Sequence, residues 1–166
     1  MANDRMIELS DKLLNKDDFE RIVYQGEKIS LSASLLNEAS VNFHFLKDFS
    51  ADKVIYGINT GFGPMAQYKI PFAERLNLQY NLIRSHSSGM GVPIPALYSR
   101  AMLLDRLNTF AQCRSGVHPD LLILITEMLN HDILPVIHEH GGVGASGDLV
   151  QLAHMALAVY HGSAFQ

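Results

Sequence analysis

Cysteine and long apolar runs are nearly or wholly absent from this sequence. Cys113 is the only cysteine among 166 residues, which excludes an internal disulfide framework. No stretch of about 18 consecutive apolar residues occurs, so the sequence predicts neither a transmembrane helix nor a membrane partner. The first ten residues lack the basic and then apolar layout of a signal peptide, and we therefore expect a cytoplasmic protein.

Charge is also sparse, with a formal net charge of −4 and 18% charged residues. This balance provides no basic surface for nucleic acid. Hydrophobic residues make up 48% of the chain, which excludes an intrinsically disordered protein. The length suffices for one domain with a core, and no repeat, linker or low-complexity tract divides it, so residues 1–166 are expected to form a single region.

Apolar residues recur mainly at helical spacing, which predicts a mainly α fold with a few short strands. Ser32 is a candidate N-cap, Pro71 a candidate helix start and Gly116 a candidate C-cap. Helices are expected over residues 17–25, 32–49, 71–85, 98–113, 119–129 and 148–160, with strands at 29–31 and 54–56.

Two of these helices, 119–129 and 148–160, are so apolar that a chain of this length can hardly cover them. Either a self-associating helical protein or a part of a longer chain would bury such surfaces.

The most informative run is Gly144-Ala145-Ser146-Gly147-Asp148. Ala-Ser-Gly can cyclise into an electrophile: the Gly147 nitrogen attacks the Ala145 carbonyl, and loss of two waters gives a methylidene-imidazolone. Glycine lets its nitrogen approach closely, and Ser146 supplies the hydroxyl that leaves. Asp148 can act as a base or proton carrier during these dehydrations.

The same run permits two other interpretations. Gly142-x-Gly144-x-x-Gly147 matches a dinucleotide-binding pattern, which requires a preceding strand, a following helix and a later acidic residue. The strand is poorly supported, because His138-Glu139-His140 interrupts the apolar stretch before it. A plain glycine-rich loop entering a helix, with Ser146 or Asp148 as N-cap, is the other alternative.

Two further segments carry distinctive patterns. Residues 54–64 read VIYGINTGFGP, in which Tyr56 lies where a short β-rich run meets a glycine-rich loop. Such loops commonly carry catalytic side chains, although a buried tyrosine in a hairpin turn is the simpler interpretation. Residues 78–91 read LQYNLIRSHSSGMG and place Ser85 and His86 at an expected helix end.

Together these three segments resemble the aromatic amino acid ammonia-lyases, the family of histidine, phenylalanine and tyrosine ammonia-lyases and related aminomutases. The similar stretch runs from about Val54 to the C-terminus. Members of that family are much longer, so the resemblance implies the N-terminal portion of an ammonia-lyase-like helical fold with a glycine-rich active-site loop. The C-terminal helical part would then be absent.

The resemblance also implies a chemistry. The family eliminates ammonia from an L-aromatic amino acid and gives a trans-arylacrylate, such as coumarate from tyrosine or urocanate from histidine. The cofactor would be a methylidene-imidazolone formed autocatalytically from Ala145, Ser146 and Gly147, with Tyr56 as the base that removes the β-proton. The site would need neither a metal nor a nucleotide.

Substrate binding is assigned by the same resemblance to Gly63, Ser85 and His86. A histidine at 86 that donates a hydrogen bond to the substrate ring favours tyrosine or histidine over phenylalanine, and Gly142, Val150-Gln151 and residues 63–67 tilt the choice slightly towards tyrosine. The family builds each site from several subunits of a homotetramer, so we expect an incomplete site in this chain alone. The pair His138-x-His140 lacks a third ligand at metal spacing.

Overall fold

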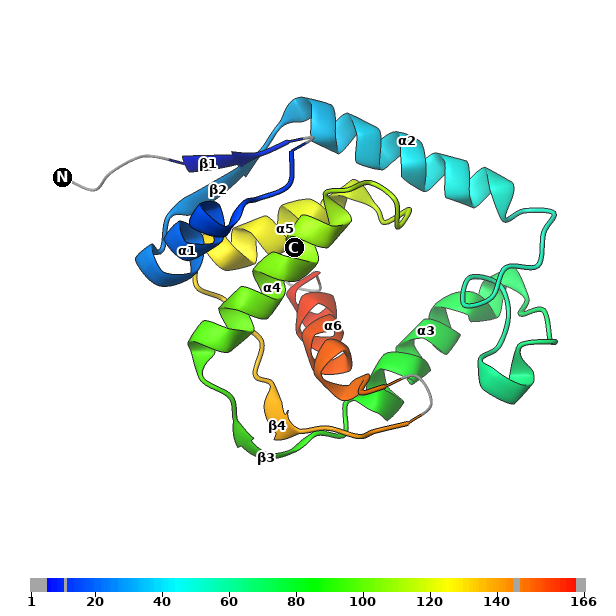
Figure 1. The fold of residues 1–166 in the computed structure, drawn as a ribbon. Coiled ribbons are helices and arrows are strands. Elements are labelled where there is room, and N and C mark those ends of the chain that lie inside the picture. The colour runs from blue at the N-terminus through cyan, green and yellow to red at the C-terminus, as the bar shows by residue number, and fades with distance from the viewer. Residues whose placement is uncertain (1–5, 11, 145–146, 164–166) are drawn as a thin grey trace.

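The computed structural model describes residues 6–10, 12–144 and 147–163, with the side chains of 161–163 excepted. The helices are α1 (Lys16–Gln25), α2 (Ala33–Phe49), the short 3₁₀ helix η1 (Gly63–Met65), α3 (Phe72–His86), α4 (Ala96–Phe110), α5 (Pro119–Asn130) and α6 (Val150–Ser163). The strands are β1 (Met6–Leu9), β2 (Lys28–Leu31), β3 (Met90–Pro93) and β4 (His138–His140). The expected mainly α fold with a few short strands is confirmed (Figure 1).

The N-terminal end of the fold is a small parallel strand pair. Strands β1 and β2 pair in parallel, with Ile7 opposite Ile29 and Leu9 opposite Leu31, and α1 makes the crossover between them. Ile7, Leu9 and Ile29 are buried, and β2 packs against α5 (Figure 1). This pair therefore closes one side of the helical core.

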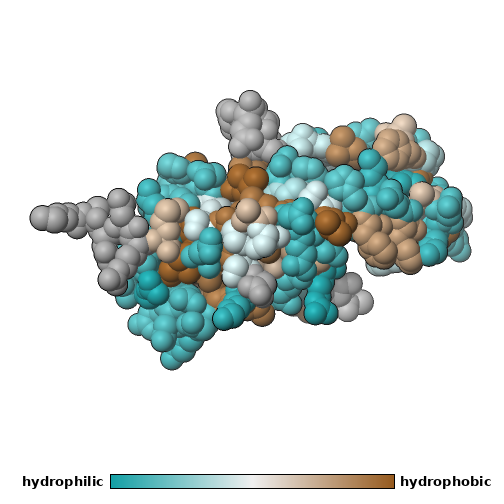
Figure 2. Space-filling model, turned by 90° about the horizontal axis from the view of Figure 1, so that it is seen from above, coloured by the Kyte–Doolittle hydropathy of each residue, from teal (hydrophilic) through white to brown (hydrophobic). Residues whose placement is uncertain are grey.

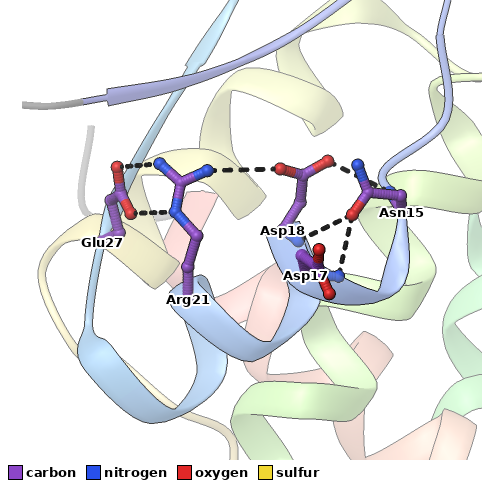
Figure 3. A network of polar contacts seen from close by, with 5 residues as sticks. All are labelled: Asn15, Asp17, Asp18, Arg21 and Glu27. Carbon is purple, nitrogen blue, oxygen red and sulfur yellow. Dashed lines mark hydrogen bonds and ion pairs between the residues drawn. The ribbon is translucent and has the colours of Figure 1, made fainter.

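Helix α1 starts at a capping box. Asn15 Oδ1 accepts hydrogen bonds from the backbone N–H groups of Asp17 and Asp18 at 2.8 and 3.1 Å, and the Asp18 carboxylate accepts from the Asn15 N–H (Figure 3). Arg21 then makes two parallel bonds to the Glu27 carboxylate, at 2.7 and 2.6 Å. These contacts hold the turn between α1 and β2, where Gly26 takes a φ of 68°.

The core lies among α4, α5 and the strand pair, with further buried residues from α1 and α2. Leu103, Leu104 and Leu107 of α4 are fully buried, and Leu122 of α5 joins them. Helix α4 contacts α1 and α5, while α5 also contacts α2 and α6. These two central helices therefore connect the N-terminal elements to the C-terminal helix.

Arg100 of α4 is a buried cation that bonds to the ends of two other helices. Its Nε donates to the Ile22 carbonyl at 3.0 Å, and its Nη1 donates to the Leu129 carbonyl at 3.1 Å and to Asp132. Both carbonyls lie in the last turns of their helices, where backbone acceptors lack intrahelical donors and positive charge is favoured.

Replacing Arg100 by methionine is expected to lower the free energy of unfolding by about 1–3 kcal/mol, because the Ile22 carbonyl loses its buried donor. Asp132 contributes little to this loss, since its side chain is 81% exposed and water can solvate it. Denaturant unfolding measures the change, with the exposed Arg114→Met as the matched control. A change below about 0.5 kcal/mol, as for an ordinary surface substitution, would contradict this role.

The second half of the fold surrounds α6. Helix α3 packs against α6, and β3 pairs antiparallel with β4 beside them (Figure 1). A cavity of about 690 Å³ lies among α3, α4, α5 and α6, lined mostly by apolar side chains that include Leu124, Leu152 and Val159. The two most apolar helices are thus only partly covered within the described part of the chain.

Apolar residues also reach the surface of α2. Val41 and Phe45 are each more than half exposed, and Phe49 stacks on Phe45 with ring centroids 5.6 Å apart. Figure 2 views the molecule from the α2 side of Figure 1 and shows apolar patches among the hydrophilic residues.

Three sequence-based expectations about local structure are wrong. Residues 54–56 form no strand, and Tyr56 begins a turn. Helix α4 ends at Phe110 and is capped by Ala111, not by Gly116. Cys113 therefore lies beyond the helix, in a left-handed conformation with a φ of 52°.

Candidate active site

The Tyr56 loop is organised by a buried asparagine. Asn59 has no exposed surface, and its amide nitrogen donates to the carbonyls of Ser50 and Lys53 at 2.9 and 2.6 Å. Its Oδ1 accepts from the Ile55 N–H at 2.8 Å. Because one side chain takes up three backbone groups, the chain turns here instead of pairing as a strand.

Tyr56 projects from this loop and is 64% exposed. The Gly63 N–H donates to its phenol oxygen at 3.4 Å, and its ring meets Phe62 edge to face at 6.1 Å between centroids. The hydroxyl is therefore open to a ligand, and Gly63, the glycine expected in substrate binding, lies beside it. The alternative of a buried tyrosine is wrong.

Ser85 and His86 end helix α3, as expected. His86 Nδ1 lies 2.9 Å from the Leu82 carbonyl and 3.1 Å from Ser85 Oγ, while Ser85 Oγ donates to the same carbonyl at 3.0 Å. A carbonyl only accepts, so Nδ1 carries the proton in this geometry, and Nε2 is an acceptor when the ring is neutral. No contact between described residues uses Nε2, so a neutral His86 offers a ligand an acceptor there and not the donor expected from the sequence.

Ala145 and Ser146 lie outside the described residues, whereas the glycines on either side of them are described. Gly144 and Gly147 bond to each other in both directions, at 3.2 and 3.1 Å. Gly147 has a φ of 81°, a conformation that favours glycine. A Cβ placed on either glycine would meet no atom within 4 Å, so nothing packs closely against these two backbone positions.

Asp148 closes the loop onto the start of α6. One oxygen of its carboxylate accepts from the N–H groups of Val150 and Gly142, at 3.0 and 3.1 Å, and these bonds lower the pKa of the carboxyl. A Cβ on Gly141 would overlap this carboxylate, so any larger residue at 141 would require the Asp148 side chain to move. Asp148 thus shapes the loop, and its role in proton transfer stays a prediction.

Helix α3 connects the three segments. Gln79 donates from the middle of α3 to the Gly57 carbonyl at 3.3 Å, which joins the helix to the Tyr56 loop. Ser85 and His86 end the same helix, and α3 packs against α6, which follows the Ala-Ser-Gly run. Among the described residues, no hydrogen bond or ring contact joins Tyr56 directly to His86 or Asp148.

The dinucleotide alternative meets a topological difficulty. A strand does precede Gly142, but it is the three-residue β4, and it pairs antiparallel with β3. The parallel strand, crossover and parallel strand that such a site requires occur only around β1 and β2 in the described part of the chain.

Within residues 6–10, 12–144 and 147–163, no cluster of three His, Cys, Asp or Glu side chains is placed to hold a metal ion. In the same ranges, no helix has the length and hydropathy needed to cross a membrane.

Sequence reasoning missed two residues that organise these loops. Asn59 lies in the VIYGINTGFGP segment, but nothing in that segment singled it out. A polar side chain inside a glycine-rich loop nevertheless often binds the loop backbone. His154 of α6 is 91% buried and bonds to the segment after His86. A single histidine within an apolar helix was the available signal.

The family model described as aromatic amino acid lyase matches residues 14–165. The chain therefore belongs to the aromatic amino acid lyases, a family of enzymes. The resemblance based on the Tyr56 and Ala-Ser-Gly segments is confirmed.

Individual relatives agree with this assignment. The chain is 41% identical over 162 residues to a probable histidine ammonia-lyase of Thermoplasma acidophilum, an alignment that covers 96% of this chain and 33% of the relative. It is similar in structure to a tyrosine aminomutase from Streptomyces globisporus (TM-score 0.83, 29% identity, 92% of this chain and 28% of that one). Histidine ammonia-lyase from Trypanosoma cruzi gives a TM-score of 0.76 at 30% identity, over 92% of this chain and 29% of that one. The chain spans about a third of the length of these proteins.

Proposed function

We propose that this chain is the N-terminal part of an ammonia-lyase that eliminates ammonia from L-histidine or L-tyrosine and gives urocanate or coumarate. The match of residues 14–165 to the lyase family carries this proposal. Relatives named histidine ammonia-lyase favour histidine as the substrate, whereas the sequence features around Gly142 and Val150 tilt towards tyrosine. An aminomutase is the alternative reaction, since a similar structure is a tyrosine aminomutase.

The proposed cofactor is the methylidene-imidazolone made from Ala145, Ser146 and Gly147. It supplies an electrophile that turns the substrate amine into a better leaving group. The Ala-Ser-Gly run in a chain that matches the aromatic amino acid lyases supports this assignment. Asp148, bonded to the N–H groups of Gly142 and Val150, holds the two ends of the loop.

Tyr56 is the proposed base for the β-proton. Its hydroxyl is exposed, and the Gly63 N–H at 3.4 Å is placed to support negative charge on the phenol oxygen. His86 and Ser85 are proposed to contact the substrate ring. The hydrogen bond between Gln79 and Gly57 holds the Tyr56 loop against α3, the helix that carries Ser85 and His86.

The working protein is proposed to be longer than this chain and to form a homotetramer. The apolar cavity among α3, α4, α5 and α6 supports the greater length, because further helices of the same polypeptide would bury the residues that line it. The length of the relatives supports it as well. Residues 1–166 then form the single N-terminal region of that enzyme, and the isolated region would lack a complete site.

Substrate choice tests the role of His86. In the complete enzyme, kcat/KM is expected to be highest for histidine or tyrosine. A site that hydrogen-bonds a polar substrate ring leaves its own buried polar groups without partners when phenylalanine, with its plain benzene ring, is bound. His86→Leu is expected to shift the ratio towards phenylalanine by about 10²-fold. Steady-state kinetics with the three amino acids measures the ratio.

His131→Leu is the matched control, since this histidine is 62% exposed at the surface end of α5. Two results would count against the assignment: phenylalanine as the best substrate of the unmodified enzyme, or an unchanged ranking in His86→Leu.

A further inference from the structure

His154 lies in the second turn of α6, six residues after Asp148. Its side chain is buried on the same part of the helix as Val150, Ala153 and Met155. A buried imidazole needs hydrogen-bond partners, and the partners of this one come from outside its own helix.

The imidazole faces two backbone N–H groups. The Gly89 N–H donates to Nε2 at 3.1 Å, and the His138 nitrogen of β4 lies 3.4 Å from Nδ1. A neutral imidazole has one acceptor nitrogen, so a single tautomer accepts only one of these bonds. The Gly89 bond is the shorter of the two, so Nε2 is the better-placed acceptor.

Gly89 fits against His154 with no space to spare. A Cβ at residue 89 would lie 2.7 Å from the His154 Cε1 atom, 3.0 Å from Nε2 and 3.1 Å from Val150 Cγ1. These atoms belong to buried side chains on α6, which cannot move aside cheaply. The absence of a side chain at 89 therefore allows the hydrogen bond to form.

This contact joins two parts of the proposed site. Gly89 lies three residues after His86, and α6 begins directly after the loop that holds the Ala-Ser-Gly run. His138 reinforces the same corner, since its Nδ1 lies 2.9 Å from the Gly91 carbonyl and its ring meets His154 edge to face at 5.5 Å. Apolar packing between α3 and α6 permits sliding, whereas a buried hydrogen bond specifies a distance and a direction.

We propose that His154 is a positioning residue: by accepting the Gly89 N–H at Nε2, it holds the segment that carries Ser85 and His86 at a defined distance from the ring-forming loop. This inference rests on the proposed function. A displacement of about 1 Å between a binding group and the reacting group lowers turnover by up to roughly 10²-fold.

Three substitutions at residue 154 separate positioning from packing. Glutamine places its carbonyl oxygen near the position of Nε2, asparagine places it near Nδ1, and leucine has no acceptor. In the complete enzyme, His154→Leu and His154→Asn are expected to lower kcat/KM per mole of ring by about 10- to 100-fold and to weaken the preference for the polar ring. His154→Gln is expected to stay within a few-fold of the unmodified enzyme.

Melting temperature is measured on the same proteins. A role in packing alone would make activity follow melting temperature and would not distinguish glutamine from asparagine. Equal losses in all three variants, or full activity and selectivity in His154→Leu, would overturn the proposal. His131→Leu again serves as the control.

Hydrogen exchange tests the contact without using activity. In His154→Leu, the peptide that covers residues 87–91 is expected to exchange at least several-fold faster than in the unmodified protein, and in His154→Gln it should stay protected. Unchanged protection in His154→Leu refutes the contact even in an active enzyme. If no aromatic amino acid is turned over by the unmodified enzyme, the proposed function fails, while the exchange result still decides whether His154 holds Gly89.

Discussion

Tyr56→Phe in the complete enzyme is expected to lower turnover by about 10²–10⁴-fold, the usual contribution of a positioned acid or base. The substitution removes only a hydroxyl that is exposed and whose contact in this chain is the Gly63 N–H at 3.4 Å. The ring contact with Phe62 does not need the hydroxyl. Fold and ring content should therefore remain normal, as checked by melting temperature and by the absorbance of the methylidene-imidazolone.

Tyr24→Phe is the matched control for this experiment. Tyr24 is 70% exposed on α1 and lies outside the proposed site. Near-normal turnover in Tyr56→Phe, or an equal loss in the control, would remove Tyr56 from the proposed mechanism.

Ring formation is expected to lower the mass of the complete protein by two waters relative to its sequence. Ser146→Ala deletes the hydroxyl that forms the exocyclic methylene, so this variant should lack the ring, and its activity should fall to the uncatalysed level. Intact mass spectrometry and a lyase assay measure both effects. Ser34→Ala, an exposed serine of α2, is the control. An active protein with the full sequence mass would refute the ring.

Gly141→Ala extends this prediction to the loop around the ring. The added Cβ would overlap the Asp148 carboxylate, which would then lose its bonds to Gly142 and Val150. Ring content is expected to fall in this variant although Ala145, Ser146 and Gly147 are intact. Gly26→Ala is a useful comparison outside the site: its Cβ would meet no atom within 4 Å, but its φ of 68° strains the turn after α1, so stability should fall while ring content stays normal.

The amino-acid sequence determined the features of this protein that depend on short stretches of chain. Helical spacing predicted α2, α3 and α5 to within a residue or two, and Ser32 does accept the Leu35 N–H as the N-cap of α2. The Tyr56 and Ala-Ser-Gly segments indicated the lyase family, because unusual chemistry restricts residue types at consecutive positions. These signals are local, and local signals are readable without a fold.

Tertiary structure decided the features that depend on distant partners. Residues 54–56 have β propensity but form no strand, because Asn59 binds three backbone groups of the surrounding turn. Gly116 is not a helix cap. It lies against Leu46 of α2, where a Cβ would come within 2.4 Å of the leucine side chain.

The pairing of β1 with β2 and the bond between His154 and Gly89 join residues that lie far apart in the sequence. The sequence around these strands and residues does not specify which segment each of them contacts. Burial supplied the missing information: once packing removes water, each backbone N–H and carbonyl must find an acceptor or donor within the fold, and only the three-dimensional arrangement determines which one is within reach.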